Sequence, residues 1–191
     1  DHGARAGFVH VADHQVSVGK KMWTWGNEEF GRAWCRNLTD DGSVYIELMA
    51  GLFTDNQPDF SFLAPGETKV FSQYWYPINE IGPVQQATTD GALRVAQTAD
   101  GIQVGVASTT ERWGVALLLR SPSWSSEVMI DVAPGRPAIV DVAVPARERE
   151  DLEVVVRDQT KDLVTWRRRT PTEASAPASE PAPPSEIDSV E

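Results

Sequence analysis

The second half of the chain is a succession of short segments in which apolar and polar residues alternate. In Glu127–Val132, for example, Val128, Ile130 and Val132 occupy one face of the pattern, and Met129 and Asp131 occupy the other. Because successive side chains of a strand point to opposite faces, this period of two predicts β-strands. Seven strands are expected, at Ala92–Gln97, Ile102–Ala107, Val115–Leu119, Glu127–Val132, Ala138–Val144, Leu152–Arg157 and Leu163–Arg167. Short alternating strands separated by turns are typical of an immunoglobulin- or fibronectin-like β-sandwich, here over residues 84–168.

The first eighty residues are also mainly β, with a less regular pattern. All six Phe and all three Tyr of the chain lie between Phe8 and Tyr76. We place the boundary at residues 77–83, where Pro and Gly interrupt the pattern. Asn27–Arg36 is predicted to be a loop with a short helical turn that Asn27 could cap. Strands are expected at Ala6–Val11, Lys21–Trp25, Val44–Phe53 and Thr68–Tyr76.

The chain opens directly into its first predicted strand. A strand without partners would leave an exposed edge. We therefore expect the preceding half of the same domain to be absent from this chain, and we expect that half to be a partner of residues 1–80.

Composition narrows the classes of partner. The net charge of −11 argues against nucleic acid, which requires clustered Lys and Arg. No stretch approaches the apolar length of a membrane span, so we expect no membrane partner and a soluble protein, with the cytoplasm as the favoured compartment. Residues 170–191 hold five acidic residues and no Lys or Arg, among Pro, Ala and Ser. This composition predicts a disordered tail.

The sequence gives little support for a metal site, a cofactor or a disulfide. His10 and His14 would share one face of a strand about 13 Å apart, too far for one metal ion, so no metal site is expected. No Gly-rich phosphate loop precedes a helix, so no cofactor is expected. The single cysteine, Cys35, excludes an internal disulfide, and we interpret it as a small buried hydrophobic residue.

The strongest chemical signal is a carboxylate within an apolar strand. In Tyr45-Ile-Glu-Leu-Met-Ala-Gly51, Glu47 would share a face with Tyr45 and Met49, while Ile46 and Leu48 face the core. Burying a carboxylate is costly unless it is paired, and partial burial suits a general acid or base. A structural ion pair with Arg32 or Arg36 is an equally good interpretation of the pattern.

The aromatic residues of the first region indicate a possible ligand. Trp23 and Trp25 lie on one face of a predicted strand, and Trp34 follows in the helical segment. Flat aromatic faces stack on the apolar face of a pyranose ring, although the same side chains also fill β-sandwich cores. We expect about half of them to be core and half to line a pocket.

Two resemblances sharpen this interpretation. The runs Tyr45-Ile-Glu-Leu, Thr54-Asp-Asn-Gln-Pro-Asp-Phe and Leu63-Ala-Pro-Gly-Glu resemble the closing motif of aldose 1-epimerases (galactose mutarotases), in which a strand glutamate is the catalytic base. Lys20-Lys-Met-Trp-Thr-Trp-Gly-Asn and Phe30-Gly-Arg-Ala-Trp are similar to a bacterial family of unknown function with a mutarotase-like supersandwich, usually N-terminal to tetratricopeptide repeats. That family usually has Asp where Cys35 stands and Gly where Glu28 stands. The resemblance implies that residues 1–80 are the C-terminal part of such a supersandwich, with a carbohydrate ligand.

Three functions stay open at this level. The chain could act on sugars as an epimerase or glycoside hydrolase with Glu47 as acid or base, bind sugars without catalysis, or support neighbouring domains as a structural module. The residues expected nearest a sugar, besides the candidate catalytic Glu47, are Trp25, Asn27, Arg32, Trp34, Asp55 and Asn56.

Overall fold

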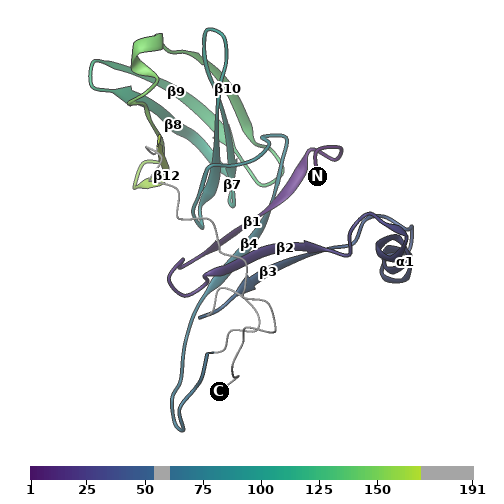
Figure 1. The fold of residues 1–191 in the computed structure, drawn as a ribbon. Helices are drawn as coiled ribbons and strands as arrows, with labels where there is room; N and C mark the ends of the chain where they lie inside the picture. The colour runs from purple at the N-terminus through teal and green to yellow at the C-terminus, as the bar shows by residue number, and fades with distance from the viewer. Residues whose placement is uncertain (54–60, 169–191) are drawn as a thin grey trace, which may run out of the picture.

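A computed structural model describes residues 1–53 and 61–168 of the chain, and the structure is all-β with one α-helix. Eight strands of the second half form two four-stranded antiparallel sheets, labelled in part in Figure 1. Sheet I has the order β10-β7-β6-β5, and sheet II has the order β12-β11-β8-β9. The strands are β5 (Gln86–Ala87), β6 (Gly91–Gln97), β7 (Gly101–Ser108), β8 (Arg112–Ser121), β9 (Trp124–Val132), β10 (Ala138–Ala143), β11 (Glu153–Arg157) and β12 (Asp162–Arg167).

The two sheets face each other across one apolar core. Leu93 and Val104 of sheet I meet Leu117 and Val154 of sheet II, and all four side chains are fully buried. Removing aliphatic surface from water in this way supplies the main stabilising free energy of a sandwich. The expected β-sandwich is therefore confirmed, with all seven predicted strands present and the two-residue strand β5 in addition.

Polar contacts join the sheets at one end of the sandwich. Arg112, which begins β8, donates hydrogen bonds to Asp90 at 2.9 Å and to Asp158 at 2.6 Å. Asp90 belongs to the turn before β6, and Asp158 to the turn after β11. Lys161 also pairs with Asp90, at 2.6 Å. Three backbone turns are thereby held together through charge-assisted hydrogen bonds.

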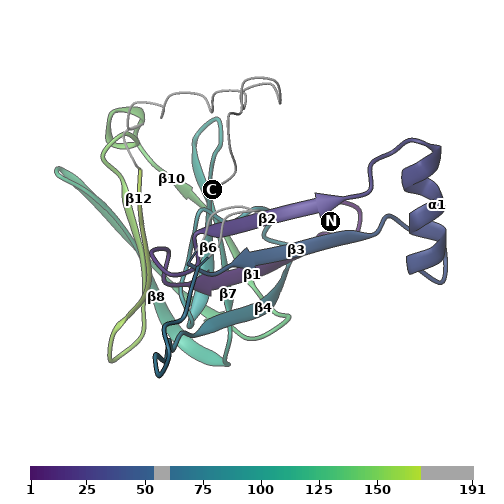
Figure 2. The same ribbon diagram turned by 60° about the horizontal axis from the view of Figure 1, so that its bottom comes forward.

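The first half forms two separate two-stranded ribbons. β1 (Ala6–Ala12) pairs with β4 (Gln73–Asn79), and β2 (Gly19–Thr24) pairs with β3 (Ile46–Gly51), both antiparallel. Between β2 and β3 the chain forms helix α1 (Glu29–Leu38). In Figures 1 and 2 the β2–β3 ribbon extends to α1, which lies away from the sandwich.

The β1–β4 ribbon packs on the outer face of sheet I. Where the ribbon packs, this face carries the small residues Ala92, Gly105 and Ala107, and Ile81 lies against them with 2% of its surface exposed. The Tyr76 hydroxyl donates a hydrogen bond to the Thr88 carbonyl at 2.9 Å. Burial raises the pKa of Tyr76 to about 12, which keeps this donor protonated at ordinary pH.

Four details of the sequence prediction need correction. The strand expected at Val44–Phe53 is limited to Ile46–Gly51, and the strand expected at Thr68–Tyr76 lies later, at Gln73–Asn79, and includes Pro77. The helical turn expected at Asn27–Arg36 is a ten-residue helix whose N-cap is Glu28. Asn27 therefore lies outside the helix and does not cap it.

The predicted tail, residues 170–191, lies outside the described residues. Within the described part of the chain, no helix has the length and apolarity needed to cross a membrane.

The close approach of Ile81 to Gly105 yields a test of how the two halves are held together. A Cβ at residue 105 would stand 2.8 Å from the Ile81 Cβ, which is closer than carbon atoms can pack. We expect Gly105→Ala to lower the free energy of unfolding by about 1–3 kcal/mol, measured by urea denaturation.

Two further variants control for this prediction. In Gly7→Ala, on β1, the new Cβ would meet the Ile78 side chain at an ordinary 3.8 Å, so stability should change little. Ile81→Gly should cost less stability in the Gly105→Ala background than in the wild type, because it removes the Cβ and Cγ2 atoms that the new methyl group would meet at 2.8 and 3.0 Å. Equal stability of Gly105→Ala and wild type would contradict the proposed packing.

Candidate functional site

Four aromatic side chains gather where β2 leads into α1. Trp25 and Trp34 stack with ring centroids 4.6 Å apart and planes at 11°. Trp23 meets Trp25 edge-on at 4.6 Å, and Phe30 meets both Trp25 and Trp34 edge-on at 6.1 and 6.4 Å. We call Trp23, Trp25, Phe30 and Trp34 the aromatic cluster. Such offset and edge-on pairs are each worth about 0.5–1.5 kcal/mol beyond the area they bury.

Local sequence explains how these rings meet. Trp23 and Trp25 are two residues apart in extended chain and project to one side, whereas Phe30 and Trp34 are one helical turn apart on α1. Gly31 lets the helix approach the preceding chain, because a Cβ there would lie 2.3 Å from the Gly26 carbonyl oxygen and 2.5 Å from that of Trp25. This close approach brings Trp34 onto Trp25.

The aromatic cluster is partly open to solvent. Trp23 is 38% exposed and Phe30 is 67% exposed, so two of the four rings offer accessible surface. The indole nitrogen of Trp25 is buried and has no hydrogen-bond partner among residues 1–53 and 61–168. A buried donor without a partner is uncommon and costs stability.

Glu47 borders the aromatic cluster. It is directly opposite Trp23 in the β2–β3 register, so both side chains project from the same face of the ribbon. Glu47 is half-buried. The expectation that Ile46 and Leu48 face the core is wrong, because they are 47% and 44% exposed. In the part of the chain that the structure describes, no second layer covers this side of the two-stranded ribbon.

The two arginines considered as partners of Glu47 have other partners. The Arg36 guanidinium pairs with Glu29 at 2.8 Å, and the Arg32 Nε donates to the Asn27 carbonyl at 2.9 Å. Arg36 also holds the pKa of Glu29 below its usual value. These contacts do not support the alternative interpretation of Glu47 as a structural ion pair with Arg32 or Arg36.

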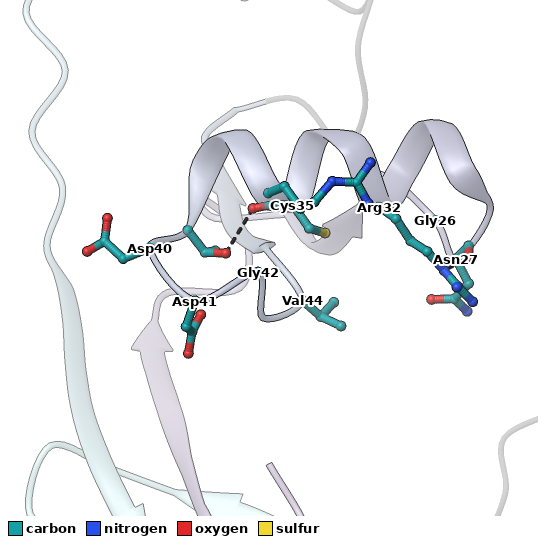
Figure 3. A pocket seen from close by; sticks show the side chains of 10 residues that line it. Gly26, Asn27, Arg32, Cys35, Asp40, Asp41, Gly42 and Val44 are labelled. Atoms are coloured by element: carbon teal, nitrogen blue, oxygen red, sulfur yellow. Dashed lines mark hydrogen bonds between the residues drawn. The ribbon is translucent and has the colours of Figure 1, made fainter.

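Asn27 and Arg32 line a cavity of about 680 Å³ between α1 and the loop that follows it (Figure 3). Asp40 and Asp41 lie at its other end, and the Cys35 side chain lies between the two ends. Cys35 is buried, and its sulfur accepts a hydrogen bond from the Tyr45 backbone N–H at 3.4 Å. Cys35 therefore packs as the small buried residue that the sequence predicted.

The cavity and the aromatic cluster lie on different faces of α1. At about 100° per residue, Arg32 and Trp34 project roughly 160–200° apart around the helix axis. The expected sugar site is thus divided: Trp25 and Trp34 are stacked and Glu47 lies opposite their neighbour Trp23, whereas Asn27 and Arg32 lie across the helix from the rings. Asp55 and Asn56 lie outside the described residues. Phe30 was not predicted as part of the site, although its spacing of four from Trp34 places both on one helical face.

His10, which is not expected to bind a metal ion, contributes to the packing of the β1–β4 ribbon. His10 on β1 stacks on Trp75 of β4 with ring centroids 4.3 Å apart. In residues 1–53 and 61–168, no group of three or more His, Cys, Asp or Glu side chains could hold a metal ion.

The fold and the site define a two-part all-β protein: a β-sandwich, and two ribbons that carry an aromatic cluster beside a carboxylate. Residues 1–78 match the family model described as a domain of unknown function, DUF5107. Residues 86–166 match the model of the second domain of YphG-like proteins. No solved structure matches the chain.

The packing of His10 predicts a dependence of stability on pH. Burial, and then the nearby positive charge of Lys20, lower the pKa of His10 below its ordinary 6.5. Between that lowered value and 6.5 the unfolded chain binds more protons than the folded one, so stability falls as the pH drops through this window and is unaffected above it. We expect urea denaturation from about pH 8 to pH 5 to show this loss, and His10→Gln to reduce it.

His14→Gln is the matched control, because His14 is exposed on the turn after β1. It should leave the pH profile unchanged. A profile that is the same in wild type and His10→Gln would show that His10 is not the titrating group.

Proposed function

We propose that this chain binds carbohydrate through the aromatic cluster. The observation that carries the proposal is the partly exposed Trp23 beside the half-buried Glu47, next to a stacked pair of indole rings. An accessible indole face suits the apolar face of a pyranose, and a carboxylate accepts hydrogen bonds from sugar hydroxyl groups. The resemblance of residues 45–67 to the closing motif of aldose 1-epimerases supports the same class of ligand.

Substitution of Trp23 tests this proposal. We expect the wild-type chain to bind D-galactose or D-glucose, or oligosaccharides of them, in isothermal titration calorimetry. Trp23→Ala should weaken that binding by about three- to tenfold, because it removes the stacking surface. Since Trp23 is partly exposed, the variant should still fold.

Trp113→Ala is the control for this experiment. Trp113 is 61% exposed on the sandwich, where its ring contacts Arg136 and not the aromatic cluster. It should leave sugar binding unchanged. If none of these sugars binds, and Trp23→Ala alters only stability, the aromatic cluster has a structural role and the proposal fails.

Catalysis at the same site is a second candidate, favoured by the position of Glu47. A carboxylate beside a stacked sugar could remove the anomeric hydroxyl proton or act in glycoside hydrolysis. In that case Glu47→Gln should abolish the anomeric conversion of D-galactose, followed by polarimetry, and keep sugar affinity within about threefold of wild type.

Two results would assign Glu47 a different role. Turnover that persists in Glu47→Gln would show that another group is the acid or base. Sugar binding by the wild type without any turnover would define a non-catalytic binding module.

We propose in addition that the upstream half of the same domain is the protein partner of the ribbons. The face of β2–β3 opposite Glu47 carries exposed Met22, Ile46 and Leu48, with Met22 70% exposed. A two-stranded ribbon is marginal in water, and a contiguous apolar face is typical of an interaction site. A mutarotase-like supersandwich would cover this face with further strands.

A further inference from the structure

The ligand preference of the aromatic cluster can be inferred from the pairing of Trp23 with Glu47. Directly opposite residues of an antiparallel pair have Cβ atoms about 4.5–5.5 Å apart. The Cβ atoms of Trp23 and Glu47 are therefore separated by about the width of one sugar ring, and both side chains project from the same face of the ribbon. A pyranose stacked on Trp23 would bring one of its ring substituents to Glu47.

A positively charged substituent would gain most from this arrangement. A cation is attracted by the face of an indole ring and by a carboxylate, whereas a hydroxyl group gains only a neutral-to-charged hydrogen bond. The two arginines of α1 project from the opposite side of the helix and bind the Asn27 carbonyl and Glu29. They are therefore not placed to neutralise Glu47.

Lys21 is the charged residue that acts against a cationic ligand. It precedes Trp23 by two residues on β2, so it shares the face of Trp23 and Glu47, and it has a contact of its own. Within the described strands β2 and β3, the charges on this face are thus one carboxylate and one ammonium, and the carboxylate belongs to the residue directly opposite Trp23.

We propose that the preferred ligands of the site are amino sugars in their protonated form, with the ring on Trp23 and the ammonium group at Glu47. This inference rests on the proposed carbohydrate binding and specifies its ligand class. It assigns Glu47 a role in ligand selection that holds whether or not the site is catalytic.

Three related sugars test the inference on the full chain. D-galactosamine, D-galactose and N-acetyl-D-galactosamine share one ring, and only the first carries an ammonium group at about pH 6. Calorimetry at low salt should show D-galactosamine binding about three- to tenfold more tightly than the two neutral sugars. Glu47→Gln should weaken the binding of D-galactosamine by about three- to tenfold and that of D-galactose by less, because the glutamine amide oxygen still accepts a hydrogen bond from a hydroxyl group but no longer attracts an ammonium group; the preference should therefore disappear.

Glu127→Gln is the matched control. It makes the same change in net charge on an exposed residue of β9 in the sandwich, so the preference for D-galactosamine should persist. Raising the salt concentration should reduce the preference and not the binding of D-galactose.

The outcomes separate this inference from the proposed function. If none of the three sugars binds, the proposed function fails and this inference fails with it. If all three bind equally to the wild type, carbohydrate binding stands and the amino-sugar preference is wrong. If the preference survives in Glu47→Gln, another group recognises the ammonium and the role assigned to Glu47 is overturned.

Discussion

The contact between Ile81 and the outer face of sheet I holds the two halves of the protein together. Ile81 occupies the space that any side chain larger than that of glycine at position 105 would need. The short side chains of Ala92 and Ala107 project little from the sheet around it. Small side chains allow the β1–β4 ribbon to approach the sheet, so that apolar area is removed from water on both sides. The sandwich thus supplies the foundation on which an otherwise marginal two-stranded ribbon can persist.

The aromatic cluster depends on a second close approach, at Gly31. There the helix backbone meets the carbonyl oxygens of Trp25 and Gly26, and this contact decides that Trp34 stacks on Trp25. The two contacts act at different levels: one positions a ribbon on the sandwich, and the other positions a helix against the end of the second ribbon. Residues on such a ribbon are held by fewer contacts than a strand in the sandwich core, so the ribbon is expected to open locally at a lower free energy than the sandwich.

The two arginines of α1 do not pair with the Glu47 carboxylate. Arg36 is paired with Glu29 and Arg32 with a backbone carbonyl, and the helical period directs both arginines away from the aromatic rings. The sandwich shows the opposite arrangement, since Glu148 and Glu153 are buried and each is hydrogen-bonded or paired with arginine. Carboxylates that stabilise the fold and the carboxylate that we assign to a ligand are thereby distinguished by their partners.

The sequence by itself determined the all-β class and the seven principal strands of the sandwich, and it singled out Glu47 as the candidate carboxylate. Alternation with a period of two is a local property of the chain, so it can be detected without the tertiary structure. Trp23 and Trp25 on one face of a strand followed from the same rule. Only the tertiary structure decided that Glu47 lies opposite Trp23, since register depends on which strands pair. It also separated Arg32 and Asn27 from the indole rings, because the predicted short turn is a full helix that directs residues 32 and 34 to opposite sides. The exposure of Ile46 and Leu48 was equally inaccessible to pattern analysis: alternation shows that two faces differ, but which face is covered depends on the elements that pack against it.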